Sequence, residues 1–123
     1  MSSDLTPEIE NPRRIRSFVK RAGRMTPSQE HALEHYWPLY GLELNQGPLD
    51  FTKIFGNDHP VIMEIGFGMG DSLSTMAATM PENNYIGIEV HRPGVGRLLN
   101  NLATQELSNV RVFCEDAIEV MAQ

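Results

Sequence analysis

The stretch VIMEIGFGMG, residues 61–70, decides the fold of this chain. Its first five residues form an apolar run with the length of a buried strand, and glycines follow at Gly66, Gly68 and Gly70. Glycines at these positions let the backbone turn sharply and approach a ligand, because no Cβ is in the way. Apolar residues then recur with the spacing of one helical face, at Leu73, Met76, Ala77 and Met80. The stretch therefore predicts a strand, a glycine loop and a helix.

The same alternation continues to the end of the chain. Residues 85–90 and 110–114 read as strands, and residues 95–103 carry a helical apolar face between them. Asp116 can cap a last helix. We therefore predict a β-α-β-α-β-α unit over residues 60–123, which is a Rossmann-like α/β fold with a parallel sheet in the order 3-2-1. In this order the strand at 61–65 presents an open apolar edge, a template for aggregation.

The N-terminal half has two further regions. We expect residues 1–25 to be a disordered leader followed by a basic arm. Residues 26–59 are predicted to hold a helix and a connecting loop. The helix begins at Thr26, with Pro27 in its first turn and Gln29 completing a capping box, and it ends near Tyr36–Trp37 because Pro38 follows. Residues 38–59 read as an irregular connection pinned by apolar side chains.

Composition and charge limit the classes of protein to which the chain can belong. The 123 residues are 41% hydrophobic and 21% charged, as in a globular domain, and no apolar run is long enough for a membrane helix. A single cysteine and the absence of a signal peptide favour the cytoplasm. The net charge is −6, but residues 13–24 hold six of the ten Lys and Arg and no acid. This basic arm is either a solvated linker or a contact for an anionic partner.

Acidic residues follow the predicted strands, where ligands bind in such sheets. Glu64 precedes the glycine loop, Glu89 ends the second strand and Asp116 follows the third. Asp71 occupies the position at which a dinucleotide fingerprint needs a small residue. Acids at these places suit a ligand with a ribose and a cation but no phosphates, and S-adenosylmethionine is such a ligand. A carboxylate near the loop can favour the ammonium group of S-adenosylmethionine. Glu89 can accept from the ribose hydroxyls of this ligand, and Asp116 can accept from its adenine amine.

Four stretches carry a resemblance to a known family. They are RRIRSFV at residues 13–19, QEHALEHYWP at 29–38, EIGFGMG at 64–70 and GIEVHRPGVG at 87–96. Together they resemble the bacterial tRNA (guanine-N7-)-methyltransferase family. The resemblance implies a class I methyltransferase fold and S-adenosylmethionine-dependent methylation of N7 of a guanine in the variable loop of tRNA. The family has seven strands, so the chain resembles its N-terminal half, and we expect it to be inactive alone.

The resemblance also implies roles for particular residues. Cofactor contacts fall on Glu64, Gly66, Gly68, Gly70, Glu89 and Asp116. The arm is expected to contact RNA through Arg13, Arg14, Arg16, Lys20, Arg21 and Arg24. Catalytic residues are expected beyond Gln123, together with a C-terminal half as a partner. The complete protein is expected to be a monomer without metal or membrane contact.

Two other functions stay open on the residues alone. One is a half-domain of an NAD-dependent dehydrogenase, and the other is a non-catalytic module that binds RNA or a nucleotide. The segment His31–His35 matches the zinc-protease pattern H-x-x-E-H, but its predicted helix is short and no distal ligand is evident. Cys114 ends a buried strand and is interpreted as a small core residue.

Overall fold

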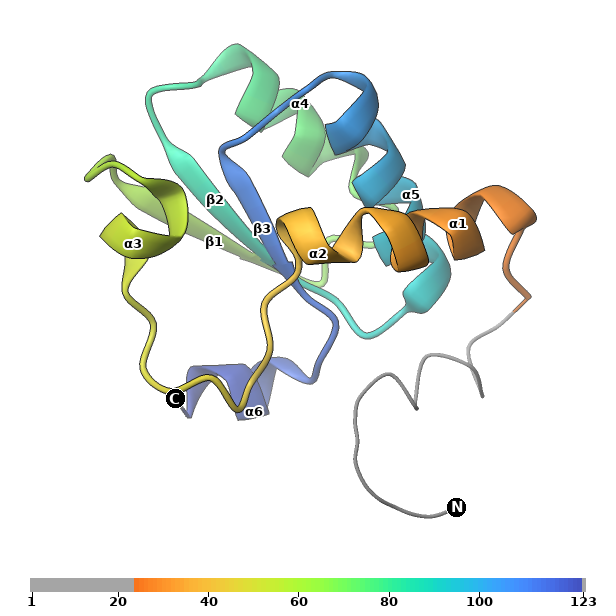
Figure 1. Ribbon diagram of the computed structural model, residues 1–123, viewed down its shortest axis with the longest axis horizontal. Helices are drawn as coiled ribbons and strands as arrows, with labels where there is room; N and C mark the ends of the chain where they lie inside the picture. The colour runs from red at the N-terminus through yellow and green to blue at the C-terminus, as the bar shows by residue number, and fades with distance from the viewer. Residues whose placement is uncertain (1–23, 123) are drawn as a thin grey trace.

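Three parallel strands form the centre of the structure (Figure 1). They are β1 (Val61–Ile65), β2 (Asn84–Ile88) and β3 (Val110–Phe113), and their order in the sheet is β1-β2-β3. The connections are the helices α4 (Asp71–Thr79) and α5 (Arg92–Thr104). This arrangement confirms the predicted parallel α/β sheet and its order. The computed structural model describes residues 24–122.

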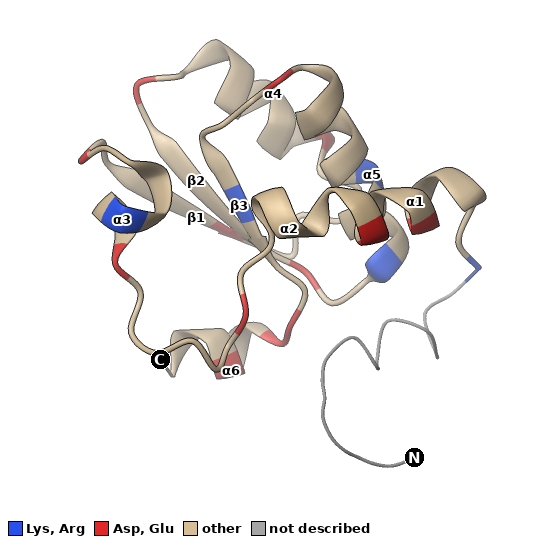
Figure 2. Ribbon diagram, in the orientation of Figure 1, with Lys and Arg blue, Asp and Glu red and all other residues tan. Residues whose placement is uncertain are grey.

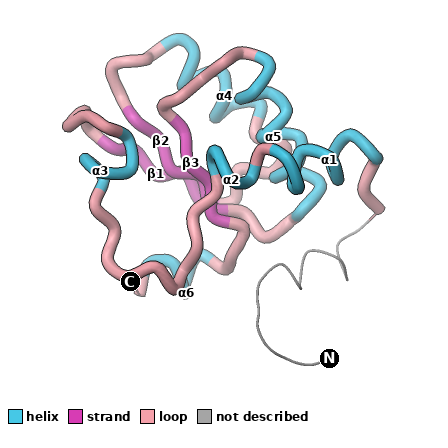
Figure 3. The backbone as a smooth tube through the Cα atoms, in the orientation of Figure 1, coloured by secondary structure: helices cyan, strands magenta, loops and turns pink. Residues whose placement is uncertain are grey.

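The two faces of the sheet have separate apolar cores, because side chains alternate along each strand. Tyr85, Val110 and Val112 point to one face, where residues of α4 and α5 cover them. Ile86 and Phe113 point to the other face and pack against a smaller cluster. Helices therefore lie on both sides of the strands (Figure 3). A parallel sheet needs this double cover since neither of its faces is polar.

The N-terminal helix α1 (Pro27–His35) adds to the first of these cores. Thr26 caps it through the predicted capping box, in which the Thr26 hydroxyl accepts from the Gln29 N–H and the Gln29 side chain accepts from the Thr26 N–H. The helix packs along α5, and Asn100 donates to the carbonyl and hydroxyl oxygens of Ser28. These contacts fix α1 on the outside of α5.

The first helix ends close to the predicted position near Tyr36–Trp37, but the expectation of an irregular connection directly from residue 38 is wrong. The helix α1 ends at His35, but a second short helix, α2 (Trp37–Tyr40), begins directly after it. Pro38 lies in the first turn of α2. A proline is tolerated there because a backbone N–H at this position has no partner within the helix. The indole of Trp37 donates to Glu43 at 2.6 Å and lies against Gly41.

The connection between α2 and β1 is more ordered than predicted. It contains the helix α3 (Phe51–Phe55), which Asp50 caps by accepting from the Lys53 N–H. Arg111 of β3 donates to the Ile54 carbonyl, and its guanidinium lies 5.1 Å from the centre of the Phe55 ring. The prediction that apolar side chains pin this segment is confirmed, since α3 packs onto the Ile86–Phe113 face of the sheet.

The strand β1 lies at the open edge of the described sheet. It pairs with β2 on one side, and three of its apolar side chains stay exposed, Ile62 at 40%, Met63 at 37% and Ile65 at 56%. The open apolar edge predicted for residues 61–65 is therefore present. The last helix, α6 (Ala117–Met121), lies below the sheet in Figure 1 and leaves Ile118 and Met121 exposed as well.

Candidate functional site

A hollow of about 190 Å³ opens at the carboxyl ends of the strands. Its lining is partly apolar and partly acidic, and it consists of Ile65, Gly66, Ile88, Glu89, Val90, Glu115, Asp116 and Ala117. Figure 2 shows acidic segments along the loops at this end of the sheet. The hollow therefore brings together Gly66, Glu89 and Asp116, three of the residues predicted to contact a ligand, and their role in binding stays a prediction.

The glycine loop forms one wall of this site. Its three glycines, Gly66, Gly68 and Gly70, have φ angles of 72°, 67° and 83°, which favour glycine because a Cβ is strained there. The loop is tied down at both ends, since the Gly66 N–H donates to the Ile88 carbonyl at 2.7 Å and the Gly70 N–H to the Phe67 carbonyl at 3.0 Å. The sequence pattern thus predicted the loop conformation correctly.

Glu89 connects this loop to the start of α5. Its Oε1 accepts from the Gly68 N–H at 2.7 Å, and its Oε2 accepts from the His91 N–H at 3.0 Å. Each carboxylate oxygen can accept a second hydrogen bond, so two acceptor positions remain for a ligand in the hollow. The sequence predicted Glu89 as a ligand contact but not this second, structural use of the same carboxylate.

The loop and α5 also meet at Gly94. A Cβ built on Gly94 would collide with the carbonyl oxygen of Gly68. Gly94 is therefore required by close packing, as it allows the N-terminal turn of α5 to lie directly against the glycine loop. The sequence does not predict this contact, because 26 positions separate Gly68 and Gly94.

Glu64 lies in β1 opposite Gly87, next to the glycine loop but outside the lining of the hollow. Its Oε1 atom is buried and has no hydrogen-bond partner among residues 24–122. A buried carboxylate oxygen without a donor is costly, so this atom is a place where a ligand donor would be stabilising. The role predicted for Glu64 in binding a ligand stays a prediction.

Asp116 is exposed and caps α6 by accepting from the Ile118 N–H at 2.8 Å. Its other carboxylate oxygen leaves acceptor capacity toward the hollow that it lines with Glu115. Glu115 also lines the hollow. Its position directly after the third strand places it in the range 115–117, where the sequence predicts ligand contacts.

Asp71 does not serve the site directly. Its carboxylate accepts from Arg97 through Nε at 3.2 Å and Nη2 at 3.3 Å, and Asn101 donates to it at 3.4 Å. This ion pair lies on the outer surface of α4 and α5, with both side chains about half exposed or more. Asp71 is not among the residues that line the hollow. The idea that its carboxylate favours a bound ammonium therefore has no geometric support.

Cys114 directly precedes Glu115, which lines the hollow. Burial raises the pKa of its thiol to about 12, although the neighbouring Arg92 guanidinium, to which it is hydrogen-bonded, acts in the opposite direction. A thiol with this pKa is protonated at neutral pH and is a poor nucleophile. The interpretation of Cys114 as a core residue agrees with this environment.

The predicted RNA-binding residues are largely outside the described part of the chain. Arg24 is described and is exposed just before α1. Arg13, Arg14, Arg16, Lys20 and Arg21 lie outside residues 24–122. Within residues 24–122, no group of three or more His, Cys, Asp and Glu is placed to hold a metal ion, and none of the helices has the length and apolar character of a membrane span.

A parallel sheet with a glycine loop after β1 and a carboxylate after β2 defines a Rossmann-like α/β fold, a class in which ligands bind at the carboxyl ends of the strands. A comparison with known families narrows this class. The family described as "Putative methyltransferase" matches residues 58–123, more than half of the chain, and the chain belongs to this family.

Curated proteins are similar over nearly the whole chain. A tRNA (guanine-N(7)-)-methyltransferase of Serratia proteamaculans (strain 568) is 57% identical over 121 residues, which are 95% of this chain and 51% of that protein. A protein of the same name from Hydrogenovibrio crunogenus is 60% identical over 112 residues, 91% of this chain and 47% of that protein. The chain spans about half the length of the curated relatives it matches. The resemblance to the N-terminal half of this family is confirmed.

Among solved structures, an antibiotic-related methyltransferase is similar in fold. The match has a TM-score of 0.50 and 22% sequence identity, and it covers 61% of this chain and 41% of the other. At this identity the likeness supports the fold alone, and it agrees with the parallel α/β sheet described above.

Proposed function

We propose that this chain supplies the cofactor-binding part of an S-adenosylmethionine-dependent tRNA (guanine-N7) methyltransferase. The observation that carries the proposal is the position of Glu89, whose carboxylate joins the glycine loop to α5 and lines the hollow. The name of the relatives that match 95% of the chain supports the reaction and the tRNA substrate.

The residues at the strand ends fit this cofactor. Glu89 keeps two acceptor positions for ribose hydroxyls, and Asp116 presents a carboxylate for the adenine amine. The unpartnered buried oxygen of Glu64 would be satisfied by a donor such as the ammonium, directly or through a water. A Cβ on Gly66 or Gly68 would meet no protein atom within 4 Å, so the loop leaves open space beside it. This donor and acceptor set also suits a ligand without phosphates.

Methyl transfer to guanine N7 needs little acid or base catalysis. The bound cofactor supplies a methyl group on a positively charged sulfur, which is a good leaving group. Guanine N7 has a free lone pair and no proton, so no general base is needed to expose it. The protein therefore contributes mainly by orientation, which can lower a barrier by roughly 7–11 kcal/mol. On the present chain, Glu89 and the glycine loop would hold the cofactor in one place.

The curated relatives are about twice as long as the part that this chain matches. We propose that the part of the protein corresponding to the second half of the relatives packs against the open edge of β1, where Ile62, Met63 and Ile65 are exposed. This part would supply the residues that grip the target guanine. The complete protein would act as a monomer in the cytoplasm, where tRNA is modified.

Calorimetric titrations of this chain test the cofactor assignment. We expect S-adenosylmethionine to bind and NAD not to bind, because the acidic site disfavours a diphosphate. Tight NAD binding with no S-adenosylmethionine binding would instead support the dehydrogenase hypothesis. The reaction is then tested by methyl transfer to tRNA with the second half of a relative supplied in trans. We expect methylated N7 only in the mixture, and cofactor binding without methylation there would support a binding module instead.

A further inference from the structure

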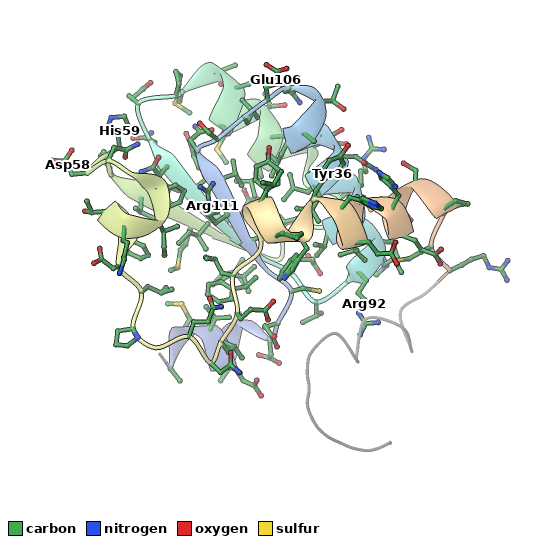
Figure 4. The ribbon with its side chains drawn as sticks, in the orientation of Figure 1. Tyr36, Asp58, His59, Arg92, Glu106 and Arg111 are labelled. Carbon is green, nitrogen blue, oxygen red and sulfur yellow. The ribbon has the colours of Figure 1, made fainter. Side chains whose placement is uncertain are left out.

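Two histidines lie one helical turn apart on α1, outside the hollow. His31 and His35 are both exposed, and their rings are stacked, with centroids 3.9 Å apart and planes at 16°. Tyr36 meets the His31 ring edge-on at 5.9 Å. In the view of Figure 4, Tyr36 lies above α1, and Arg92, at the start of α5, lies below it. Neither histidine lines the hollow, so the pair is a separate feature of the helix surface.

A hydrogen bond fixes which ring nitrogen of His35 is available to a ligand. The Nδ1 atom of His35 lies 3.1 Å from the carbonyl oxygen of His31, and because a carbonyl oxygen only accepts, the proton is on Nδ1. In the neutral ring the lone pair is then on Nε2. Metal-binding histidines are held in the same way, with the second ring N–H donating to a carbonyl or a carboxylate. The His35 ring is therefore oriented as a metal ligand would be.

The backbone beneath the pair is held by tertiary contacts. Ala32 and Leu33, which lie between the two histidines, are buried, and Asn100 of α5 donates to Ser28 in the first turn of α1. Side chains at positions i and i+4 of a helix share one face, so both imidazoles can reach one ion without a change of backbone. The second imidazole then binds intramolecularly, which makes the pair a tighter ligand than either ring alone.

The charges around the pair favour a cation. Glu30 and Glu34 are exposed on the same helix and would repel an anion. His35 lies in the last turn of α1, where the helix dipole places partial negative charge. Neutral imidazole is a ligand for Cu²⁺, Ni²⁺ and Zn²⁺, whereas Mg²⁺ and Ca²⁺ prefer oxygen ligands. The chemistry of the pair therefore selects a divalent transition-metal ion.

We propose that His31 and His35 form a two-histidine site for such an ion, namely Cu²⁺, Ni²⁺ or Zn²⁺. Within residues 24–122 no third His, Cys, Asp or Glu is placed to join the pair, so water completes the coordination. The bound ion would link two successive turns of α1 and stabilise this helix on α5. It lies outside the hollow and takes no part in methyl transfer, so the site does not depend on the proposed function.

Calorimetric titration of the 123-residue chain with NiCl₂ tests this site. The wild type is expected to bind one Ni²⁺ and to bind Cu²⁺ more tightly, following the general order of affinities of these ions. His31→Asn and His35→Asn should each lower the Ni²⁺ affinity at least about tenfold, because each leaves a single imidazole. The matched control is His59→Asn, which removes an exposed histidine before β1 and should retain the wild-type affinity.

A relocated histidine separates the geometry of the pair from the number of histidines. Glu30→His combined with His35→Asn keeps two histidines on α1 but places them at adjacent positions, which do not face each other. This variant should bind Ni²⁺ as weakly as His35→Asn alone. An excess of Mg²⁺ should not displace Ni²⁺ from the wild type, because imidazole nitrogens and not carboxylate oxygens hold the ion.

Stability measurements on the same variants check that α1 stays folded. Circular dichroism without metal should give equal helix content in all of them, since the replaced side chains are exposed. Ni²⁺ should raise the melting temperature of the wild type but not of His31→Asn/His35→Asn, because an ion that binds only the folded helix stabilises it. The proposal is overturned by a wild type without saturable Ni²⁺ binding, by wild-type affinity in either single variant or in the relocated variant, or by displacement with Mg²⁺.

Discussion

The backbone N–H of Gly68 donates a 2.7 Å hydrogen bond to Oε1 of Glu89, 21 positions further along the chain. The second oxygen of the same carboxylate accepts from the His91 N–H at 3.0 Å. One side chain therefore holds the glycine loop and the start of α5 together, and it faces the hollow with its remaining acceptor positions. The residue proposed to bind the cofactor is therefore also part of the scaffold of the candidate site.

Replacing Glu89 with glutamine should harm both stability and ligand binding. The amide retains one acceptor oxygen and turns an NH2 group toward one of the two backbone donors. Hydrogen bonds to charged groups contribute about 1.5–3 kcal/mol, so a loss of this size in unfolding free energy is expected. The affinity for S-adenosylmethionine should fall at least about tenfold. Chemical unfolding and calorimetry measure the two effects, with Glu82→Gln in the exposed turn before β2 as control.

Gly94→Ala tests the contact between the glycine loop and α5. Its Cβ would collide with the Gly68 carbonyl oxygen, so the loop must shift, at a cost of about 1–3 kcal/mol. Gly96→Ala is a matched control on the same helix, since its Cβ would lie 2.8 Å from the Gln29 carbonyl oxygen of α1 instead. Both variants should be less stable, but only Gly94→Ala should lose S-adenosylmethionine affinity. Equal affinities in the two variants would contradict a role for this contact in the site.

Asp71→Asn should leave ligand binding almost unchanged. The Asp71 carboxylate pairs with Arg97 on an exposed surface, and exposed pairs contribute about 0–1 kcal/mol. We expect a small loss of stability that shrinks further in high salt, and an S-adenosylmethionine affinity within about twofold of the wild type. A large loss of affinity in calorimetry would show that the carboxylate acts on the ligand after all.

Cys114 should be unreactive in the folded protein. With the pKa of its thiol raised by burial to about 12, about one thiol in ten thousand is ionised at about pH 8. A thiol reagent should therefore label the folded chain slowly and the denatured chain at once. Fast labelling without denaturant would contradict the burial.

The same thiol should make stability depend on pH in alkali. The ordinary thiol pKa is 9.0, so above this value the unfolded chain loses a proton that the folded chain retains. The contribution of this group is fully present below about pH 9 and is lost as the pH rises toward 12. Unfolding titrations of the wild type and of Cys114→Ala should therefore diverge only in alkaline solution.

The open edge of β1 should cause self-association. Its unpaired backbone groups and the exposed side chains of Ile62 and Ile65 can pair with another strand. We expect concentration-dependent association in sedimentation experiments and a shift toward the monomer in Ile65→Lys, since a lysine on an edge strand opposes pairing. Leu39→Lys, at a similarly exposed leucine on α2, should not change the association.

Much of the fold followed from local patterns. Apolar residues with a period of two or of 3.6 marked the strands and helices from residue 60 onward, and the Thr26–Gln29 capping box marked the start of α1. The φ angles of the glycine loop follow from the glycines themselves. These features depend on a few neighbouring residues, so the sequence contains all the information that they need.

Other features arise only when distant residues meet. The helix α3 has five residues and no strong signal of its own, and it is held by Arg111 from β3, 57 positions away from Ile54. The carboxylates of Glu89 and Asp71 look alike in the sequence, as each lies near a strand end or a loop. In the folded chain, Glu89 accepts from two backbone N–H groups beside the hollow, whereas Asp71 pairs with an arginine on the outer surface.

The sequence by itself determined the alternation of strands and helices, the glycine loop and the family to which the chain belongs, because these are properties of local spacing and of matched motifs. Only the tertiary structure decided which acids face the hollow and why Gly94 must be glycine. Those depend on distances between residues that are far apart along the chain, and such distances are set by the packing of the helices on the sheet.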